Sequence, residues 1–259
     1  MNSLIAFFDR FGRSIFAALE EMGGMLLLFL SVVAWAVRPP FKIRLIVKQM
    51  EFVGVKSIFV VVLTGLFTGM VMTLQICYGF RMFSAETLVG STVALAMARE
   101  LGPVLTSLMV TARAGSAMAA ELGTMRVTEQ IDALYVMAAN PVKTLIVPRV
   151  IAGITMLPVL TVVSVFVGVV GAYFVGVPIL GINKGMFMKN MTTFVELSDI
   201  YNGLVKAAFF GLILSFVGCY KGFNTTGGAE GVGKATTEAV VIAAITILIS
   251  DYFLTALMF

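Results

Sequence analysis

The sequence predicts an all-α integral membrane protein with five transmembrane helices, preceded by N-terminal helices that are interfacial or re-entrant. Two observations predict this class. Hydrophobic residues make up 59% of the 259 residues and charged residues only 12%, against about 45–50% and 25% in soluble domains. Long apolar runs also alternate with short polar segments. Because no polar block is long enough to fold separately, we expect a single membrane domain.

The N-terminal region, residues 1–52, predicts interfacial or elbow helices. Residues 1–21 place aromatic and charged side chains on opposite faces of a helix, which is typical of a helix that lies at the membrane surface. The apolar run 22–37 is shorter than the roughly 20 residues that cross a bilayer. It stops at Arg38-Pro39-Pro40. We therefore interpret residues 22–37 as re-entrant or interfacial rather than as a span.

Five better spans follow within residues 53–259, and each is long enough, or nearly so, to cross as a helix. They are 57–80, 88–112, a long one within 150–179, 203–219 and 237–258. Small residues recur at four-residue spacing, as in Gly65 and Gly69 or in Gly203, Ala207 and Gly211. Such faces let helices approach closely. The pattern leaves open whether they pack within the chain or between subunits.

The distribution of Lys and Arg predicts the orientation. Most of the 18 cationic residues lie in residues 1–56, 113–149 and 220–236, whereas Arg81, Lys184, Lys189 and the nearby Lys206 belong to the opposite side. Cytoplasmic loops carry the excess of positive charge. We therefore expect a cytoplasmic N-terminus and a C-terminus on the outer side.

Three charged residues lie inside predicted spans: Arg99, Glu100 and Asp251. A charge in hydrocarbon costs about 2.5–3.5 kcal/mol on insertion scales and persists where it has a partner or a polar cavity. Arg99 and Asp251 lie at a similar distance from the predicted cytoplasmic face, so they could pair. Arg99 and Glu100 point about 100° apart on a helix, so both cannot contact one partner in the same way.

The polar segment 121–134, between the second and third spans, predicts a short helix held against another protein. It lies outside the bilayer and mixes charged and amide side chains with apolar ones. The polar members are Arg126, Glu129, Gln130 and Asp132, and the apolar members are Leu122, Met125, Ile131 and Leu134.

Several motifs in and around these segments resemble those of one family. They are SAET at 84–87, RELGP at 99–103, RAGSA at 113–117, AELG at 120–123, MRVTEQ at 125–130, PR at 148–149, KATT at 234–237 and LTALMF at 254–259. Together they resemble the MlaE (YrbE) family, the permease subunits of Mla-type ABC transporters. The resemblance covers roughly residue 53 to the C-terminus. The first fifty or so residues match only in general character.

The resemblance implies a lipid-transport subunit in a bacterial inner membrane with a periplasmic C-terminus. It implies a homodimer, an ABC ATPase similar to MlaF, a periplasmic MCE-domain protein similar to MlaD, and a small STAS-domain subunit similar to MlaB. Phospholipid would be the cargo. ATP and magnesium would bind the partner ATPase, so this chain would carry no cofactor.

Residues 121–134 resemble the family's coupling helix, which docks on the cytoplasmic ATPase. On this interpretation Arg126, Glu129 and Asp132 supply polar contacts, and Met125 and Leu134 are apolar anchors. The full set of expected docking residues is Glu121, Met125, Arg126, Thr128, Glu129, Gln130, Asp132 and Leu134.

The resemblance also implies a lipid pocket at the dimer interface. Its expected residues are Leu74, Gln75, Tyr78, Phe83, Arg99, Glu100 and Asp251. For Gln75 and Tyr78, plain interface packing stays an alternative. For the three charged residues, a structural polar network and direct contact with a lipid head group both stay open.

Other classes of function are disfavoured by particular residues. Histidine is absent, which removes the usual general base and the commonest metal ligand, and no basic run with interleaved aromatics indicates nucleic-acid binding. Residues 228–234 match phosphate-loop spacing, but Ala235 stands where Ser or Thr must bind magnesium. We expect a flexible loop there and a chain that is not an enzyme.

Two alternatives remain from other classes. The first is a gradient-driven secondary transporter or channel that uses Arg99, Glu100 and Asp251 as an ion relay, although inverted repeats, which would favour it, are not found. The second is a membrane anchor for a complex, in which these three charges could be neutralised without loss of activity.

Overall fold

The computed structural model describes residues 2–39 and 42–258, with side chains for residue 16 and from residue 19 onward. Every regular element in the described residues is helical, which confirms the predicted class. The α-helices are α1 Asn2–Val37, α2 Ile43–Val53, α3 Ile58–Arg81, α4 Val89–Ala96, α5 Gly102–Val110, α6 Ser116–Val127, α7 Gln130–Val136, α8 Val147–Gly176, α9 Lys184–Phe194, α10 Leu197–Phe223 and α11 Gly228–Met258. Short 3₁₀ turns are η1 Val55–Ser57 and η2 Glu86–Leu88, and the π-helical segments are η3 Met97–Leu101, η4 Thr111–Gly115 and η5 Val142–Ile146.

The predicted second span, 88–112, is part of one much longer helical run. It begins at η2 and continues through α4, η3, α5 and η4 to the end of α6. Pro103 lies in the first turn of α5, directly after η3. Because proline has no N–H to give to the carbonyl of Arg99, four residues earlier, it disturbs the regular ladder there. π-Helical turns of this kind are frequent at functional sites.

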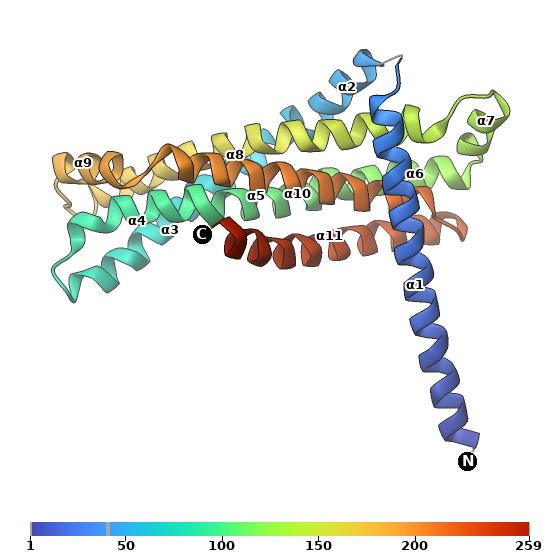
Figure 1. Ribbon diagram of the computed structural model, residues 1–259. Helices are drawn as coiled ribbons and strands as arrows, with labels where there is room; N and C mark the ends of the chain where they lie inside the picture. The colour runs from blue at the N-terminus through green and yellow to red at the C-terminus, as the bar shows by residue number, and fades with distance from the viewer. Residues whose placement is uncertain (1, 40–41, 259) are drawn as a thin grey trace.

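The long helices lie alongside one another in a bundle (Figure 1). Helix α3 packs mainly on α8, α8 packs also on α10, and α10 packs on α6 and α11. The elbow helix α2, helix α7 and the α10–α11 connection gather at one end, and the α3–α4 connection and α9 lie at the other (Figure 1). The segments that the cation count places on one side of the membrane are therefore at one end of the bundle.

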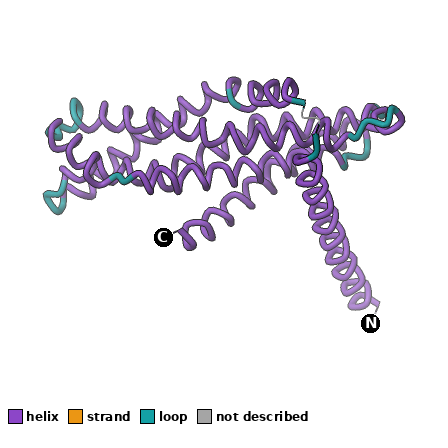
Figure 2. The backbone as a smooth tube through the Cα atoms, turned by 45° about the horizontal axis from the view of Figure 1, so that its top comes forward, coloured by secondary structure: helices purple, strands orange, loops and turns teal. Residues whose placement is uncertain are grey.

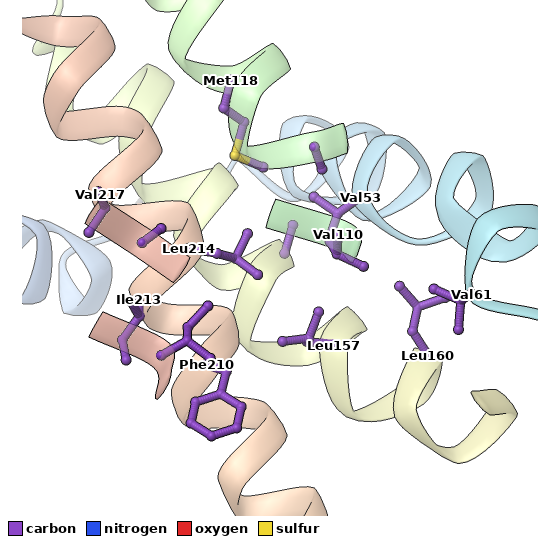
Figure 3. Close-up of a cluster of buried hydrophobic side chains, with 14 residues drawn as sticks. Val53, Val61, Val110, Met118, Leu157, Leu160, Phe210, Ile213, Leu214 and Val217 are labelled. Carbon is purple, nitrogen blue, oxygen red and sulfur yellow. The ribbon is translucent and has the colours of Figure 1, made fainter. Parts of the chain in front are cut away.

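The core of the bundle is apolar and closely packed (Figure 3). Its largest cluster joins Val61 of α3, Leu157 of α8 and Phe210 of α10, all essentially inaccessible to solvent. Glycines permit the closest crossings, because a methyl group on Gly69 would overlap the carbonyl oxygen of Gly168. Gly211 meets Gly153 in the same way. These small residues therefore pack against other helices of the same chain, which was one of the two alternatives, packing within the chain or between subunits, that the sequence left open.

Helix α1 differs from the prediction for residues 1–37. It is one continuous helix, and Leu19–Val37 is one of six helices in the described part of the chain that are long and apolar enough to cross a membrane, rather than five. It crosses the bundle instead of running along it (Figures 1 and 2). It ends at Val37, before Arg38 and Pro39, as the sequence predicts. The aromatic and charged faces predicted for residues 1–21 lie mostly outside the described side chains.

Two segments predicted as connections are helical. Residues 180–202 contain α9, which begins where the Asn183 side chain accepts hydrogen bonds from the backbone N–H groups of Gly185 and Met186 at 2.9 and 3.2 Å. Residues 228–234, predicted as a flexible loop, belong to the first turns of α11. Positive φ angles at Gly227 and Gly228 turn the chain into that helix.

Candidate functional site

A buried lysine lies at the centre of the charges inside the bundle. Lys206 of α10 is 0% exposed. Its Nζ lies 2.7 Å from Glu100 Oε2 of η3 and 3.3 Å from Asp251 Oδ1 of α11. It also donates to Thr255 Oγ1 at 2.7 Å and to the carbonyl of Arg99 at 3.2 Å. Lys206 of α10 thus connects η3 and α11. It also donates a hydrogen bond to the Arg99 carbonyl, to which Pro103 cannot donate because proline has no N–H.

Arg99 pairs with a carboxylate that the sequence analysis did not single out. Its Nη2 and Nε lie 2.6 and 2.7 Å from Oδ1 of Asp199. Asp199 is buried in the first turn of α10, and its other oxygen accepts the backbone N–H of Glu196 at 3.0 Å. Because Asp199 and Lys206 are seven residues apart, they lie on one face of α10. That face presents opposite charges to Arg99 and Glu100, which point in different directions.

Sequence reasoning missed Asp199 and Lys206 as members of this cluster. Lys206 was grouped with the cations of the outer side, although it follows Gly203 by only three residues and belongs to an apolar span. A lysine within a span, with an aspartate on the same helical face, was the available signal.

The cluster, defined as Arg99, Glu100, Asp199, Lys206 and Asp251, contains two cations and three carboxylates. Lys206 and Asp199 are buried, whereas the side chains of Arg99 and Glu100 remain 39% and 36% exposed. The cluster therefore has an inner part that holds helices together and an outer edge that a polar ligand can reach. A guanidinium group suits a phosphate oxygen, and a carboxylate suits an ammonium group.

The other expected pocket residues, on α3 and just after it, face outward in the single chain. Gln75, Tyr78 and Phe83 are exposed, and Leu74 is half-buried. One copy of the chain does not enclose them in a cavity.

Residues 121–134 form the end of one helix and the start of another, not the single short helix that was predicted. Helix α6 ends at Val127, Glu129 has a φ of 61°, and α7 begins at Gln130. Arg126 Nη1 lies 2.5 Å from Asp132 Oδ1, and Gln130 Nε2 donates to Thr128 Oγ1 at 3.0 Å. We call residues 121–137 the α6–α7 hairpin.

The apolar side chains expected as anchors in this hairpin are partly buried. Met125 packs against the buried cluster around Leu122, and Leu134 is half-buried. More exposed apolar side chains come after Leu134: Tyr135, Val136, which is 88% exposed, and Met137. At the base of the hairpin, Glu121 Oε2 lies 2.8 Å from Nη2 of Arg149, which is buried on α8.

Membrane-length helices that hold charged residues at helix crossings, with an exposed polar hairpin at one end, define a multi-pass membrane protein of the transport type. The comparisons with known proteins agree with this class. The model of the family described as "Permease MlaE" matches residues 46–257. The chain belongs to the MlaE permease family, as its motifs predict.

Similar proteins extend over most of the chain. A probable ABC transporter permease protein of Rickettsia felis is 44% identical over 248 residues, which cover 96% of each chain. The intermembrane phospholipid transport system permease protein MlaE of Haemophilus influenzae is 43% identical over 83% of each chain. The chloroplastic protein TRIGALACTOSYLDIACYLGLYCEROL 1 of Arabidopsis thaliana is 42% identical over 82% of this chain and 61% of its own length.

Proposed function

We propose that this chain is the membrane subunit of an ABC transporter that moves phospholipid between the inner membrane and an MCE-domain partner. Its similarity along most of its length to a phospholipid transport permease carries this proposal. On this view, the movement of phospholipid by the transporter maintains the lipid homeostasis of the outer membrane. A partner ATPase supplies the energy and binds ATP and magnesium, and this chain makes and breaks no covalent bonds.

In the proposed topology α3, the 86–127 run, α8, α10 and α11 cross a bacterial inner membrane. Residues 53–259 form the permease domain, and residues 1–52 lie at the cytoplasmic interface. Two observations support this arrangement. Most Lys and Arg residues belong to the end with α2 and α7, which the positive-inside rule places in the cytoplasm. Helix α1 crosses the direction of the bundle, as a helix in the interface would (Figure 1).

The proposed lipid site lies between two copies of the chain. Tyr78 and Phe83 are large, exposed side chains on or next to α3, and a second copy would cover such a surface. Arg99 and Glu100 form the reachable edge of the charged cluster, with Asp251 behind them, and would contact the head group. Leu74 and Gln75 would line the wall beside Tyr78.

The α6–α7 hairpin is the proposed docking element for a partner ATPase similar to MlaF. A small STAS-domain subunit similar to MlaB is a further proposed partner. Tyr135, Val136 and Met137 offer an apolar surface, and Glu129 lies at the exposed turn. The ion pair of Arg126 with Asp132 holds the hairpin in shape. The Glu121–Arg149 pair links its base to α8, which is a route for movement from the ATPase to the spans.

Purification from the native membrane tests this proposal. The tagged wild-type chain should bring down an ATPase, an MCE-domain protein and phospholipid. Glu129→Lys should lose the ATPase, whereas Glu230→Lys, an exposed charge reversal on α11 at the same end, should keep it. A chain that comes down alone in all three preparations would contradict the proposal. Transport that continues without an ATPase and stops with an ionophore would favour the gradient-driven alternative.

A further inference from the structure

An apolar groove lies on the side of the bundle, under α9. It has a volume of about 480 Å³ and is lined by residues of α4, η3, α8, α9 and α10. Its wall includes Ala94, Val162, Phe166, Val195 and Leu204. Neither Arg99, Glu100 nor Asp251 lines it. The groove is therefore a different place from the lipid site proposed between subunits.

The lining offers nothing for a polar ligand to bind. Thr161 and Thr192 carry its only hydroxyl groups among the residues named for it. The Thr161 hydroxyl already donates to the Leu157 carbonyl at 2.9 Å, and the Thr192 hydroxyl donates to backbone carbonyls at 3.0 and 3.1 Å. Because these hydroxyl protons are already used, the groove suits a hydrocarbon chain.

The length of the groove is close to the thickness of one leaflet of a bilayer. Its α8 wall runs from Thr161 to Val169, which is roughly 12 Å at 1.5 Å per residue. Half of a hydrocarbon core of about 30 Å is roughly 15 Å. An acyl chain that enters the bilayer at the level of α9 can therefore lie along the groove for most of the depth of its leaflet.

The helix that covers the groove is positively charged. Met191 and Thr192 of α9 line the groove, and α9 contains Lys184 and Lys189 but no Asp or Glu. Both lysines are exposed, and neither forms an ion pair with a described residue. Glu196, the next carboxylate along the chain, accepts a hydrogen bond from Ser198 at 3.2 Å. The helix that covers the groove therefore carries two exposed cations of the kind that bind a lipid phosphate.

We propose that this groove binds one acyl chain of a phospholipid from the outer leaflet, with the lipid phosphate held by Lys184 and Lys189. The proposal rests on the proposed function only in placing α9 at the outer face of the membrane. Each copy of the chain then has a lateral lipid site of its own, besides the site between subunits.

Tryptophan quenching by brominated acyl chains tests this site in the full chain. Val162 lines the groove and is 48% exposed, whereas Val159, one turn earlier on α8, is 52% exposed and does not line it. The reporters are Val162→Trp and Val159→Trp, each in a Trp35→Phe background because Trp35 is the chain's one tryptophan. The chain is placed in phosphatidylcholine nanodiscs that contain a small fraction of brominated phosphatidylglycerol.

If the groove binds an acyl chain, the fluorescence of the Val162→Trp reporter should be quenched at least about twofold more than that of the Val159→Trp reporter when the brominated fraction is low. Adding Lys184→Gln and Lys189→Gln should remove that excess. Equal quenching at both positions, an excess unaffected by the lysine changes, or weaker quenching at Val162→Trp because protein fills the groove would each overturn the proposal.

A second measurement avoids filling the groove with an indole. Wild-type chain in the same nanodiscs is irradiated with phosphatidylglycerol that carries a diazirine on its acyl chain. Peptides containing Met191 or Leu204 should be labelled more than the exposed face of α11 around Ile245; equal labelling would count against the site. Neither experiment uses ATP or a partner, so the groove can fail while ATP-driven transport stands, and the reverse.

Discussion

Removing the buried ammonium group of Lys206 should destabilise the bundle strongly. Lys206→Met keeps most of the side-chain volume but leaves Glu100 and Asp251 without the cation that now lies 2.7 and 3.3 Å from them. Breaking a buried ion pair by removing one partner costs about 3–5 kcal/mol, because a charge stays buried without compensation. The side chains of Glu100 and Asp251 are 36% and 21% exposed, so we expect the lower end of this range, about 3 kcal/mol. For a chain of this size that corresponds to a fall in Tm of roughly 6–12 °C.

Thermal unfolding of the detergent-solubilised chain measures this loss. Glu100→Gln added to Lys206→Met should recover part of the stability, because one uncompensated carboxylate is removed. Lys184→Met is the matched control, since that lysine is exposed on α9, and its Tm should stay within about 2 °C because surface changes are worth at most about 0.5 kcal/mol. A Lys206→Met chain as stable as this control would refute the reasoning. A double variant less stable than Lys206→Met would do the same.

Three further predictions follow from packing and exposure. Gly69→Ala should lower the Tm, because its methyl group meets the Gly168 carbonyl oxygen, whereas Gly79→Ala on the same helix has open space and should not; equal Tm values would show that the α3–α8 crossing is not so close. Glu121→Gln should destabilise the chain by about 1 kcal/mol in denaturant unfolding, since Glu121 is 53% exposed, and by more than Arg149→Met, because only Glu121→Gln leaves the buried guanidinium without a carboxylate; the reverse order would contradict this. Val136→Asp should abolish ATPase co-purification and Val136→Thr should preserve it, at unchanged Tm; loss in both variants would point to a fold defect.

The class of fold was predictable because its signals are long and repeated. Apolar runs of about 20 residues are required to cross a bilayer as helices, and such runs are present near α3, α8, α10 and α11. Helix α1 was harder to interpret from the sequence. The run 22–37 is short by itself, and only the structure joins it to the preceding residues in one helix.

Only part of the charged cluster could be predicted from the sequence. Arg99, Glu100 and Asp251 are conspicuous because apolar residues surround them in sequence. Their partners were not assigned, because pairing depends on which helices cross and at which residue. The close approach of Gly203 to the Ala98 carbonyl brings α10 against η3, and this tertiary contact places Asp199 and Lys206 beside the charges of η3.

For the hairpin, the sequence motif identified the segment but did not show which of its side chains are exposed. The motif pointed to residues 121–134, and those residues do form an exposed projection. The turn at Glu129 rotates α7 relative to α6, so that Ile131 is buried and Val136 faces out. The predicted anchors Met125 and Leu134 are partly covered as a result, because a single continuous helix would present a different face.

Transport by the purified complex tests the central claim most directly. The tagged chain is isolated from its native membrane with whatever binds it, reconstituted in liposomes with fluorescent phospholipid, and supplied with ATP or with a non-hydrolysable analogue. The account predicts phospholipid movement with ATP only, and its loss in a preparation carrying Glu129→Lys. Movement that needs no ATP, or hydrolysis of ATP without any movement of phospholipid, would contradict it.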